Sequence, residues 1–183
     1  PDDIFFLTWD EAQRASEDPG AWIRTTANAG RAAFTHWEQL TSPPFLGSPP
    51  DISLLDADTQ RTLRHFFGLR QPSIKDGVIK GHPASRGTVT GRARIIRHLD
   101  ESDRLEPGDI MVCVTTAPPW TALFAIASAI VTDTGGALSH SAICAREFAI
   151  PCVVGTQLAT TTIPDGATIT VDGEAGTVTI LPD

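Results

Sequence analysis

The chain has 183 residues, a formal net charge of −8 and 41% hydrophobic residues, enough for one compact core with an appendage. The excess of acidic residues excludes the basic surface that nucleic-acid binding requires, and no apolar run approaches the roughly 20 residues needed to cross a bilayer. The start, Pro1-Asp2-Asp3, is the opposite of a basic signal sequence, so a cytoplasmic protein is expected.

Residues 1–78 are predicted to be helical. In "LTWDEAQRA", Thr8 stands three residues ahead of Glu11 and predicts a capping box, while "AWIRTTANAGRAAFTHWEQL" and "DADTQRTLRHFFGL" show helical spacing of apolar residues. The segments "TSPPFLGSPPDIS" and "RQPSIKDG" interrupt this pattern and are candidate hinges or linkers. Because the first residue is proline and not methionine, we expect either processing or excision from a longer polypeptide, with excision as the preferred interpretation.

From about residue 79 the sequence changes to short β-rich runs separated by glycine. These are "GTVTGRARII", "DIMVCV", "AIVTD", "CVVGT" and "ATITVDGEAGTVTIL", of which the last predicts a hairpin. Between them, "PPWTALFAIAS" and "SHSAICAREFA" have helical length and periodicity. Strands and helices alternate here, which predicts an α/β unit with β-rich flanks.

The stretch "TDTGGALSHSAICAREFAIPCVVGT", residues 132–156, places a glycine turn just before a helix. Ser139 is the expected N-cap, so His140 would lie in the first turn, at the positive end of the helix. Backbone N–H groups at such an end form a recurrent phosphate-binding arrangement. The pattern therefore predicts a phosphate site at this helix start.

His140 at that site is a candidate nucleophile, because an imidazole is mostly neutral near pH 7 and attacks phosphorus readily. From the residues alone, a helix cap or a surface histidine is the competing interpretation, and Arg146 is equally compatible with a solvated helix face. If His140 accepts a phosphoryl group, the residues expected to stabilise it are Thr134, Gly135, Gly136, Ser139 and Arg146.

Several other chemistries are excluded. The only lysines, Lys75 and Lys80, belong to no GxxxxGK[ST] loop, so P-loop nucleotide binding is excluded. Ser139 has no GxSxG elbow, and adjacent helical side chains diverge, so His140 cannot easily act as its base. The histidines and cysteines form no metal-ligand cluster. The cysteines lack CxxC spacing and are expected to be reduced core residues: Cys113, Cys144 and Cys152.

Residues 132–156 closely resemble the phosphohistidine signature of the PEP-utilising enzyme mobile domain, found in phosphoenolpyruvate synthase, pyruvate phosphate dikinase, enzyme I and rifampin phosphotransferase. "GHPASRGTVTGRARII" is similar to the family's opening G-x-P-x-S-x-G segment, and "EPGDIMVCVTTAPPWTALFAIASAIVTDTGG" to its central strand, helix and strand. The resemblance covers about residues 79–183. It implies an α/β fold, a swivelling β/β/α phosphohistidine domain over 79–183, with residues 1–78 as a helical segment from a neighbouring domain.

The resemblance also implies a function and partners. In dikinase-type members an ATP-grasp domain transfers the β-phosphoryl of ATP to the histidine, and the domain then swings to an acceptor-substrate domain or subunit. His140 takes the place of that histidine. The chain itself is then expected to bind no cofactor and no metal, with ATP and Mg²⁺ at the partner domain, and to be inactive toward ATP alone.

One position departs from the pattern of the pyruvate-linked branches. They usually carry threonine two residues before the histidine, where this chain has Leu138, so the sequence looks closer to the branch of rifampin phosphotransferase and phenylphosphate synthase. A hydroxyl compound such as a phenol or an antibiotic is then the expected acceptor, with pyruvate as the alternative.

Two further hypotheses belong to other classes: a non-catalytic regulatory module that keeps the fold, and a small metal-binding or hydrolase domain. The regulatory module predicts that residues of the phosphohistidine signature have been lost. The metal-binding or hydrolase domain would need ligand clusters or catalytic-triad spacing, which the sequence lacks. The signature is intact at Gly135, Gly136, His140, Ala145, Arg146, Glu147, Pro151 and Gly155.

Overall fold

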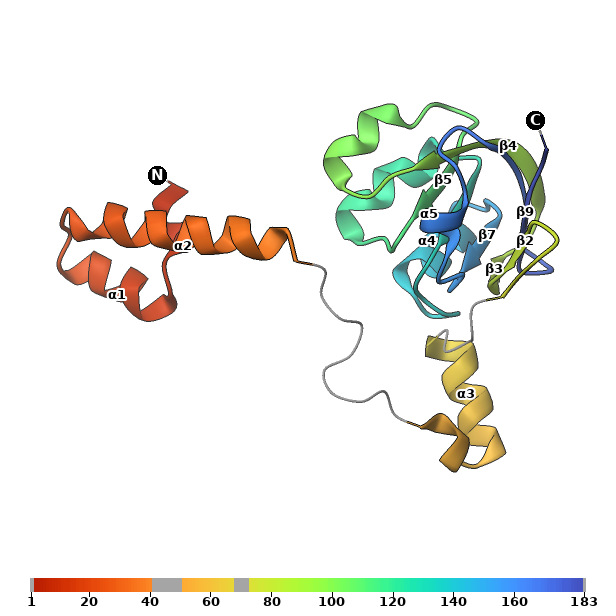
Figure 1. The fold of residues 1–183 in the computed structure, drawn as a ribbon, viewed down its shortest axis with the longest axis horizontal. Coiled ribbons are helices and arrows are strands. Elements are labelled where there is room, and N and C mark those ends of the chain that lie inside the picture. The colour runs from red at the N-terminus through yellow and green to blue at the C-terminus, as the bar shows by residue number, and fades with distance from the viewer. Residues whose placement is uncertain (1, 41–50, 68–72, 183) are drawn as a thin grey trace. The chain divides into compact units, whose positions relative to one another are not determined.

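The structure is a computed structural model that describes residues 2–40, 51–67 and 73–182. Its backbone contacts divide the chain into two compact units, Pro1–Pro50 and Asp51–Asp183 (Figure 1). The proline-rich segment 41–50 and the start of the second predicted linker, residues 68–72, lie outside the described residues.

The first unit is helical, as predicted, with η1 (Asp2–Phe6), α1 (Trp9–Glu17) and α2 (Trp22–Glu38). The capping box of α1 is confirmed, because the Glu11 N–H donates to Thr8 Oγ1 at 3.4 Å and the Thr8 N–H donates to Glu11 Oε2 at 2.8 Å. Helix α2 approaches η1 so closely that a Cβ on Gly30 would lie 2.1 Å from the Phe6 carbonyl oxygen. Glycine at this position therefore lets the two segments pack.

The second unit begins with η2 (Ile52–Leu54) and α3 (Ala57–Phe67) and continues into a nine-stranded mixed sheet. The strands are β1 (Ile74–Lys75), β2 (Val78–Lys80), β3 (His82–Ser85), β4 (Thr88–Ile95), β5 (Ile110–Cys113), β6 (Ala129–Thr132), β7 (Cys152–Val154), β8 (Thr168–Asp172) and β9 (Thr177–Ile180). The connecting helices are η3 (Leu99–Arg104), η4 (Pro118–Ala125), α4 (His140–Glu147) and α5 (Ala159–Thr162).

The sheet has the strand order β1-β2-β9-β8-β4-β5-β6-β7-β3. Strands β4, β5, β6 and β7 pair in parallel, while the pairs on either side of them are antiparallel. The chain thus forms a parallel α/β centre with antiparallel flanks, and the predicted fold class is confirmed. The predicted C-terminal hairpin is present as β8 and β9.

Both faces of the parallel centre are buried, as expected for strands that read as continuous apolar runs. In β5, Ile110 and Val112 join one apolar cluster and Met111 and Cys113 join the other. Helix α4 contributes Ala142 and Ala145 to the second cluster, where η4 contributes Leu123 and Phe124, whereas α5 packs Ala159 on the first. The core therefore fixes α4 against the sheet.

The sheet extends beyond the predicted boundary at residue 79, because β1 and the first residue of β2, Val78, precede it. They pair antiparallel across Asp76 and Gly77, with φ of 53° and 74°, and an Asp-Gly pair in this conformation is typical of a two-residue hairpin turn. The end of "RQPSIKDG", predicted as a linker, is therefore strand and turn. The boundary itself stays a prediction.

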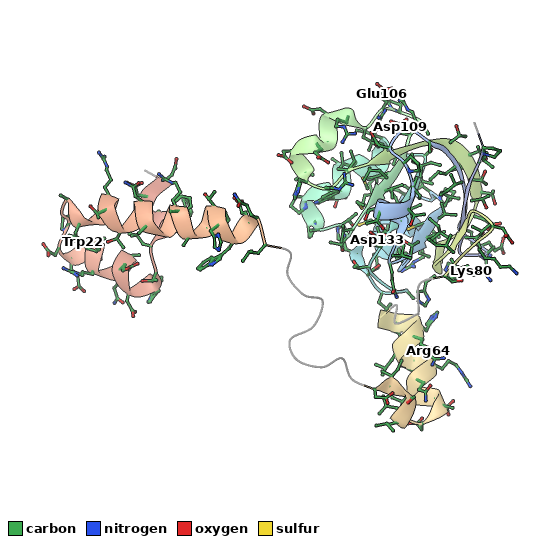
Figure 2. The ribbon with its side chains drawn as sticks, in the orientation of Figure 1. Trp22, Arg64, Lys80, Glu106, Asp109 and Asp133 are labelled. Carbon is green, nitrogen blue, oxygen red and sulfur yellow. The ribbon has the colours of Figure 1, made fainter. Side chains whose placement is uncertain are left out.

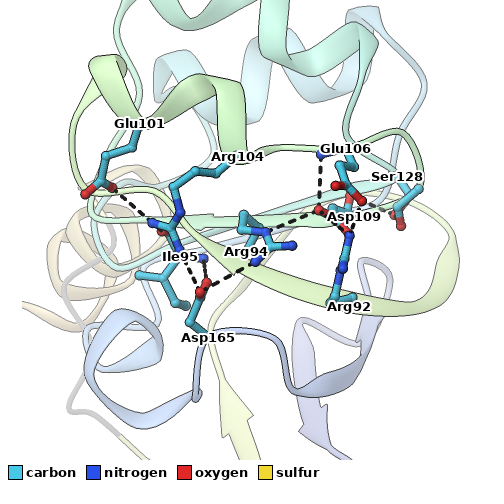
Figure 3. A network of polar contacts seen from close by, with 10 residues as sticks. Arg92, Arg94, Ile95, Glu101, Arg104, Glu106, Asp109, Ser128 and Asp165 are labelled. Atoms are coloured by element: carbon cyan, nitrogen blue, oxygen red, sulfur yellow. Dashed lines mark hydrogen bonds and ion pairs between the residues drawn. The ribbon is translucent and has the colours of Figure 1, made fainter.

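A charge network joins the first parallel strand pair (Figure 3). The Asp109 carboxylate, 4% exposed, accepts from Arg92 Nε at 2.8 Å and lies 3.4 Å from Arg94 Nε. It also accepts from the Glu106 N–H at 3.1 Å. Burial raises the pKa of Asp109, yet the hydrogen bonds from Arg92 and Glu106 outweigh burial and hold the pKa below its ordinary value. The network thus ties β4 to the start of β5.

Candidate active site at His140

The site lies where parallel strands β5 and β6 end at the same edge of the sheet. Their pairing continues past the strands, because the Asp133 N–H donates to the Cys113 carbonyl at 3.1 Å and the Thr134 N–H donates to the Val114 carbonyl at 2.9 Å. The loops that follow the two strands are therefore held side by side. This edge of a parallel sheet is where α/β proteins place their ligands.

The end of β6 is anchored by Asp133, a buried carboxylate labelled in Figure 2. Its Oδ1 accepts from Thr156 Oγ1 at 3.0 Å and from the Thr160 N–H at 3.2 Å, and its Oδ2 accepts from the Thr160 hydroxyl. These bonds connect the strand end to α5 and the loop before it. The glycine turn that follows Asp133 therefore starts from a fixed point.

The glycine turn and the helix start fit each other closely. Gly135 has a φ of 108°, and a Cβ on this residue would lie 2.8 Å from Ser139 Oγ, so any larger residue would displace that hydroxyl. Ser139 Oγ accepts from the Ala142 N–H at 3.3 Å and is the N-cap of α4, as predicted. His140 is thus the first residue of the helix.

The His140 ring is held through Nδ1. Thr116 Oγ1 lies 2.8 Å from this nitrogen and also 2.8 Å from Ser141 Oγ. Thr116 is 6% exposed and Ser141 is 1% exposed, whereas His140 is half-buried. The ring of Phe124 meets the imidazole edge to face at a centroid distance of 6.1 Å. Nδ1 is therefore occupied by a buried hydroxyl pair, which leaves Nε2 as the nitrogen for chemistry.

Cys144, one helical turn after His140, places its sulfur beside the ring. Sγ lies 3.5 Å from Nε2 and 4.0 Å from Nδ1. A sulfur lying along the outward direction of Nε2 would be much farther from Nδ1 than from Nε2, so these similar distances show that Cys144 does not lie along that direction. Cys144 therefore contacts Nε2 from the side of the ring.

Arg146 and Thr134, predicted to stabilise a phosphoryl group, donate to backbone carbonyls in the structure. Arg146 Nη1 donates to the Ala84 carbonyl and Nη2 to the Ala137 carbonyl, each at 2.9 Å. Thr134 Oγ1 donates to the Val114 carbonyl at 3.0 Å. Both side chains hold the loop that precedes His140 in place. Their roles toward a phosphoryl group, like those of Gly135 and Gly136, stay predictions.

Two residues of the site, Thr116 and Ser141, were missed in the sequence. Cys113 and Cys152 are buried core residues as expected, and burial raises the pKa of Cys113 to about 12. Cys144 is a free thiol that packs against the second apolar cluster, as expected of a core residue, but it is only half-buried and it also contacts His140. Helical spacing signals this contact, because residues four apart share a face. Thr116 follows the strand "DIMVCV", so its position at the same sheet edge as His140 was a usable signal.

Within residues 2–40, 51–67 and 73–182, no group of three or more metal-binding side chains is placed to hold an ion. The helices of the same residues include none with the length and apolarity of a membrane span.

Comparison with known proteins identifies the family. Residues 105–176 match the family described as "PEP-utilising enzyme, mobile domain". The chain contains a PEP-utilising enzyme mobile domain. The matched residues run from the end of η3 to the turn before β9 and include Thr116, Ser139, His140 and Cys144. The resemblance inferred from the sequence is thereby confirmed.

Relatives of this mobile domain are parts of much longer proteins. The chain is 39% identical over 189 residues to the uncharacterized phosphotransferase YvkC of Bacillus subtilis, covering 98% of this chain and 21% of that protein. It is 37% identical over 183 residues to a rifampicin phosphotransferase of Streptomyces sviceus, covering 98% and 19%. A solution structure of the Enzyme I (nEIt) protein has a TM-score of 0.40 and 34% identity, covering 46% of this chain and 35% of that one. The chain thus spans about a fifth of these curated relatives.

Proposed function

We propose that the chain is the phosphocarrier part of a dikinase-type phosphotransferase, in which His140 accepts a phosphoryl group on Nε2. The observation that carries the proposal is the contact between His140 Nδ1 and Thr116 Oγ1 at 2.8 Å. This contact is made in the first turn of a helix that follows the strand-end loop of a mobile domain. A nucleophile needs one nitrogen held and the other open, and the geometry supports both conditions.

The reaction follows from this geometry. The Nε2 lone pair attacks the phosphorus, and the bond from phosphorus to its leaving oxygen breaks with the electron pair going to that oxygen. The N–H groups of the first turn of α4 and the positive end of its dipole favour the negative charge of the bound phosphoryl group. The resemblance to dikinase-type members implies that the donor is the β-phosphoryl of ATP, bound with Mg²⁺ on an ATP-grasp partner domain. Because the chain has no P-loop of its own, we expect the isolated chain to be inactive toward ATP.

Exposed apolar side chains beside the nucleophile support docking to a partner. Leu138 is 64% exposed and Ile143 45% exposed, on either side of His140 in the sequence, and Phe148 at the end of α4 is 39% exposed. Exposed apolar side chains mark interaction sites where they form one contiguous patch. Such a patch beside His140 suits a carrier that presses its helix start against a nucleotide-binding domain and then against an acceptor domain.

For the acceptor we propose a hydroxyl compound such as a phenol or an antibiotic. Leu138 places an apolar, exposed side chain two residues before the nucleophile, and relatives with 98% coverage of this chain include rifampicin phosphotransferases. Pyruvate is the alternative, because a probable phosphoenolpyruvate synthase of Methanothermobacter thermautotrophicus is 34% identical over 156 residues. A regulatory module without catalysis would need no nucleophile. The labelling experiment distinguishes it from a phosphotransferase with either acceptor, because a regulatory module would gain no phosphoryl group.

Phosphorylation of the chain tests the function. With ATP, Mg²⁺ and the nucleotide-binding domain of the same parent protein, the chain should gain one phosphoryl group that is labile in acid and stable in base, because protonation of a ring nitrogen makes the imidazole a good leaving group. His140→Ala should abolish the label. His36→Ala, in α2 of the first unit, is the control and should keep it. Label that persists in His140→Ala, or that survives acid, would refute the carrier role of His140.

A further inference from the structure

Ser141 is a buried hydroxyl one residue after the nucleophile. It is 1% exposed, and its Oγ lies 2.8 Å from Thr116 Oγ1, which in turn lies 2.8 Å from His140 Nδ1. Three side chains therefore form a chain of polar contacts that ends at Ser141 inside the protein. The mechanism above uses Thr116 and His140 but gives Ser141 no role.

The direction of the hydrogens along this chain decides whether His140 can react. A threonine hydroxyl has a single hydrogen, so Thr116 donates to one neighbour and accepts from the other. If Thr116 donates to Nδ1, the proton of the neutral ring is on Nε2, and no lone pair is available there. If Thr116 accepts from an Nδ1–H group, the Nε2 lone pair is free.

We propose that Ser141 is a positioning residue that accepts the hydrogen of Thr116 and thereby holds the His140 proton on Nδ1. The hydrogens then run from Nδ1 to Thr116 Oγ1 and from Thr116 to Ser141 Oγ, and Nε2 keeps its lone pair. This inference deepens the proposed function and rests on it. Unlike the proposed function, the position of the His140 proton is a property of the unphosphorylated chain.

The same direction suits both transfers. On uptake, the N–P bond forms from the Nε2 lone pair, the P–O bond of the phosphoanhydride breaks toward the leaving oxygen, and the proton stays on Nδ1. On release, the oxygen of a hydroxyl acceptor forms the new P–O bond, the N–P electron pair returns to Nε2, and the acceptor's proton passes to a base or to water at its own site. A ring already protonated on Nδ1 is the better leaving group in this second step.

The test measures the tautomer of His140 in the full chain by NMR of ¹⁵N-labelled histidine near pH 7. The unsubstituted protein should carry its proton on Nδ1, and Ser141→Ala should shift the ring toward the Nε2-protonated form, because Thr116 is then free to donate to Nδ1. Labelling of His140 by phosphoramidate, a small phosphoryl donor that needs no partner domain, should slow by about 3- to 10-fold, the effect of one hydrogen bond.

Ser85→Ala is the matched control. Ser85 is also buried, and its hydroxyl donates to the Ala145 carbonyl of α4 at 3.3 Å. Removing this hydroxyl perturbs the same helix but leaves the hydrogen bonds among Ser141, Thr116 and His140 unchanged. Tautomer and labelling rate should both be unchanged in this variant.

Two results would overturn the proposal: an unchanged tautomer in folded Ser141→Ala, or a proton on Nε2 in the unsubstituted chain. The second measurement needs no variant, so it decides even if Ser141→Ala does not fold. Failure of the proposed function is a separate outcome, seen as the absence of acid-labile label on His140 of the unsubstituted chain.

Discussion

At the scale of single residues, the reactive nitrogen of His140 is selected by what the other nitrogen contacts. Thr116→Val removes the oxygen that lies 2.8 Å from Nδ1 while nearly preserving side-chain volume. We expect phosphorylation of His140 to slow by about tenfold or more, since the ring loses a hydrogen bond that fixes both its orientation and its tautomer. The initial rate of acid-labile labelling measures this effect.

Thr116→Ser keeps the hydroxyl and should restore most of the rate, which a purely structural role of the threonine methyl would not allow. Thr121→Val is the control, because its exposed hydroxyl donates to the Pro118 carbonyl at 2.7 Å and has no link to the ring. Equal rates for Thr116→Val and Thr121→Val would contradict the role of Thr116.

The sequence predicts the parts of the site that are local in the chain. Ser139 and His140 follow from a cap and a helix start, which are patterns of a few residues. Thr116 lies 24 residues before His140, and only the parallel pairing of β5 with β6 brings the two together. Arg146 shows a second limit, because its sequence position allows it to face a phosphate or a carbonyl, and only the packing of α4 on β3 decides between them.

At the scale of elements, the fit between the glycine turn and α4 is open to test. Gly135→Ala should destabilise the protein, because alanine is strained at a φ of 108° and its Cβ would lie 2.8 Å from the capping hydroxyl of Ser139. Gly166→Ala is the control for strain alone, since its φ is 87° and nothing lies within 4 Å of its Cβ position.

We expect Gly135→Ala to cost about 1 kcal/mol more free energy of unfolding than Gly166→Ala, the typical value of a lost helix cap. It should also slow labelling of His140, whereas Gly166→Ala should not. Denaturant unfolding and labelling of both variants measure this difference. An equal loss of free energy of unfolding in the two variants would show that Ser139 can move without loss of the cap.

The network around Asp109 predicts how stability depends on pH. The pKa of Asp109 is lower in the folded protein than its ordinary value of about 3.9, because hydrogen bonds from Arg92 and Glu106 overcome the effect of burial. Its contribution to stability is therefore fully present above that ordinary value and is lost as the pH falls through the lower folded pKa.

Asp109→Asn should lower the free energy of unfolding by about 2 kcal/mol at neutral pH, as expected for hydrogen bonds to a charged group. The difference in free energy of unfolding between Asp109→Asn and the unsubstituted protein should become smaller as the pH falls below about 4. Denaturant unfolding at several pH values measures it. A difference that is constant with pH would show that the charge of Asp109 contributes nothing.

At the scale of the whole molecule, the α/β centre was predictable because each strand is a short apolar run and each helix shows apolar residues at helical spacing. The strand order was not, since β2 pairs with β9 and β3 with β7 across most of the second unit. The flanks are therefore where sequence reasoning is weakest. Strand β1 falls inside a segment predicted as a linker, and β2 follows that segment directly, with Ile79 fully buried in the core.

This placement yields a prediction about where the carrier domain begins. Fragment 73–183 keeps β2, whose Ile79 pairs with Val178 of β9, whereas fragment 81–183 removes the strand and uncovers that edge of the sheet. Because loss of a buried isoleucine side chain alone costs about 2–5 kcal/mol, we expect 73–183 to fold cooperatively and 81–183 to be markedly less stable. Thermal melting and limited proteolysis of the two fragments measure this. If both melt at the same temperature, β1 and β2 are dispensable, and the domain begins near residue 80 as its resemblance to the family implies.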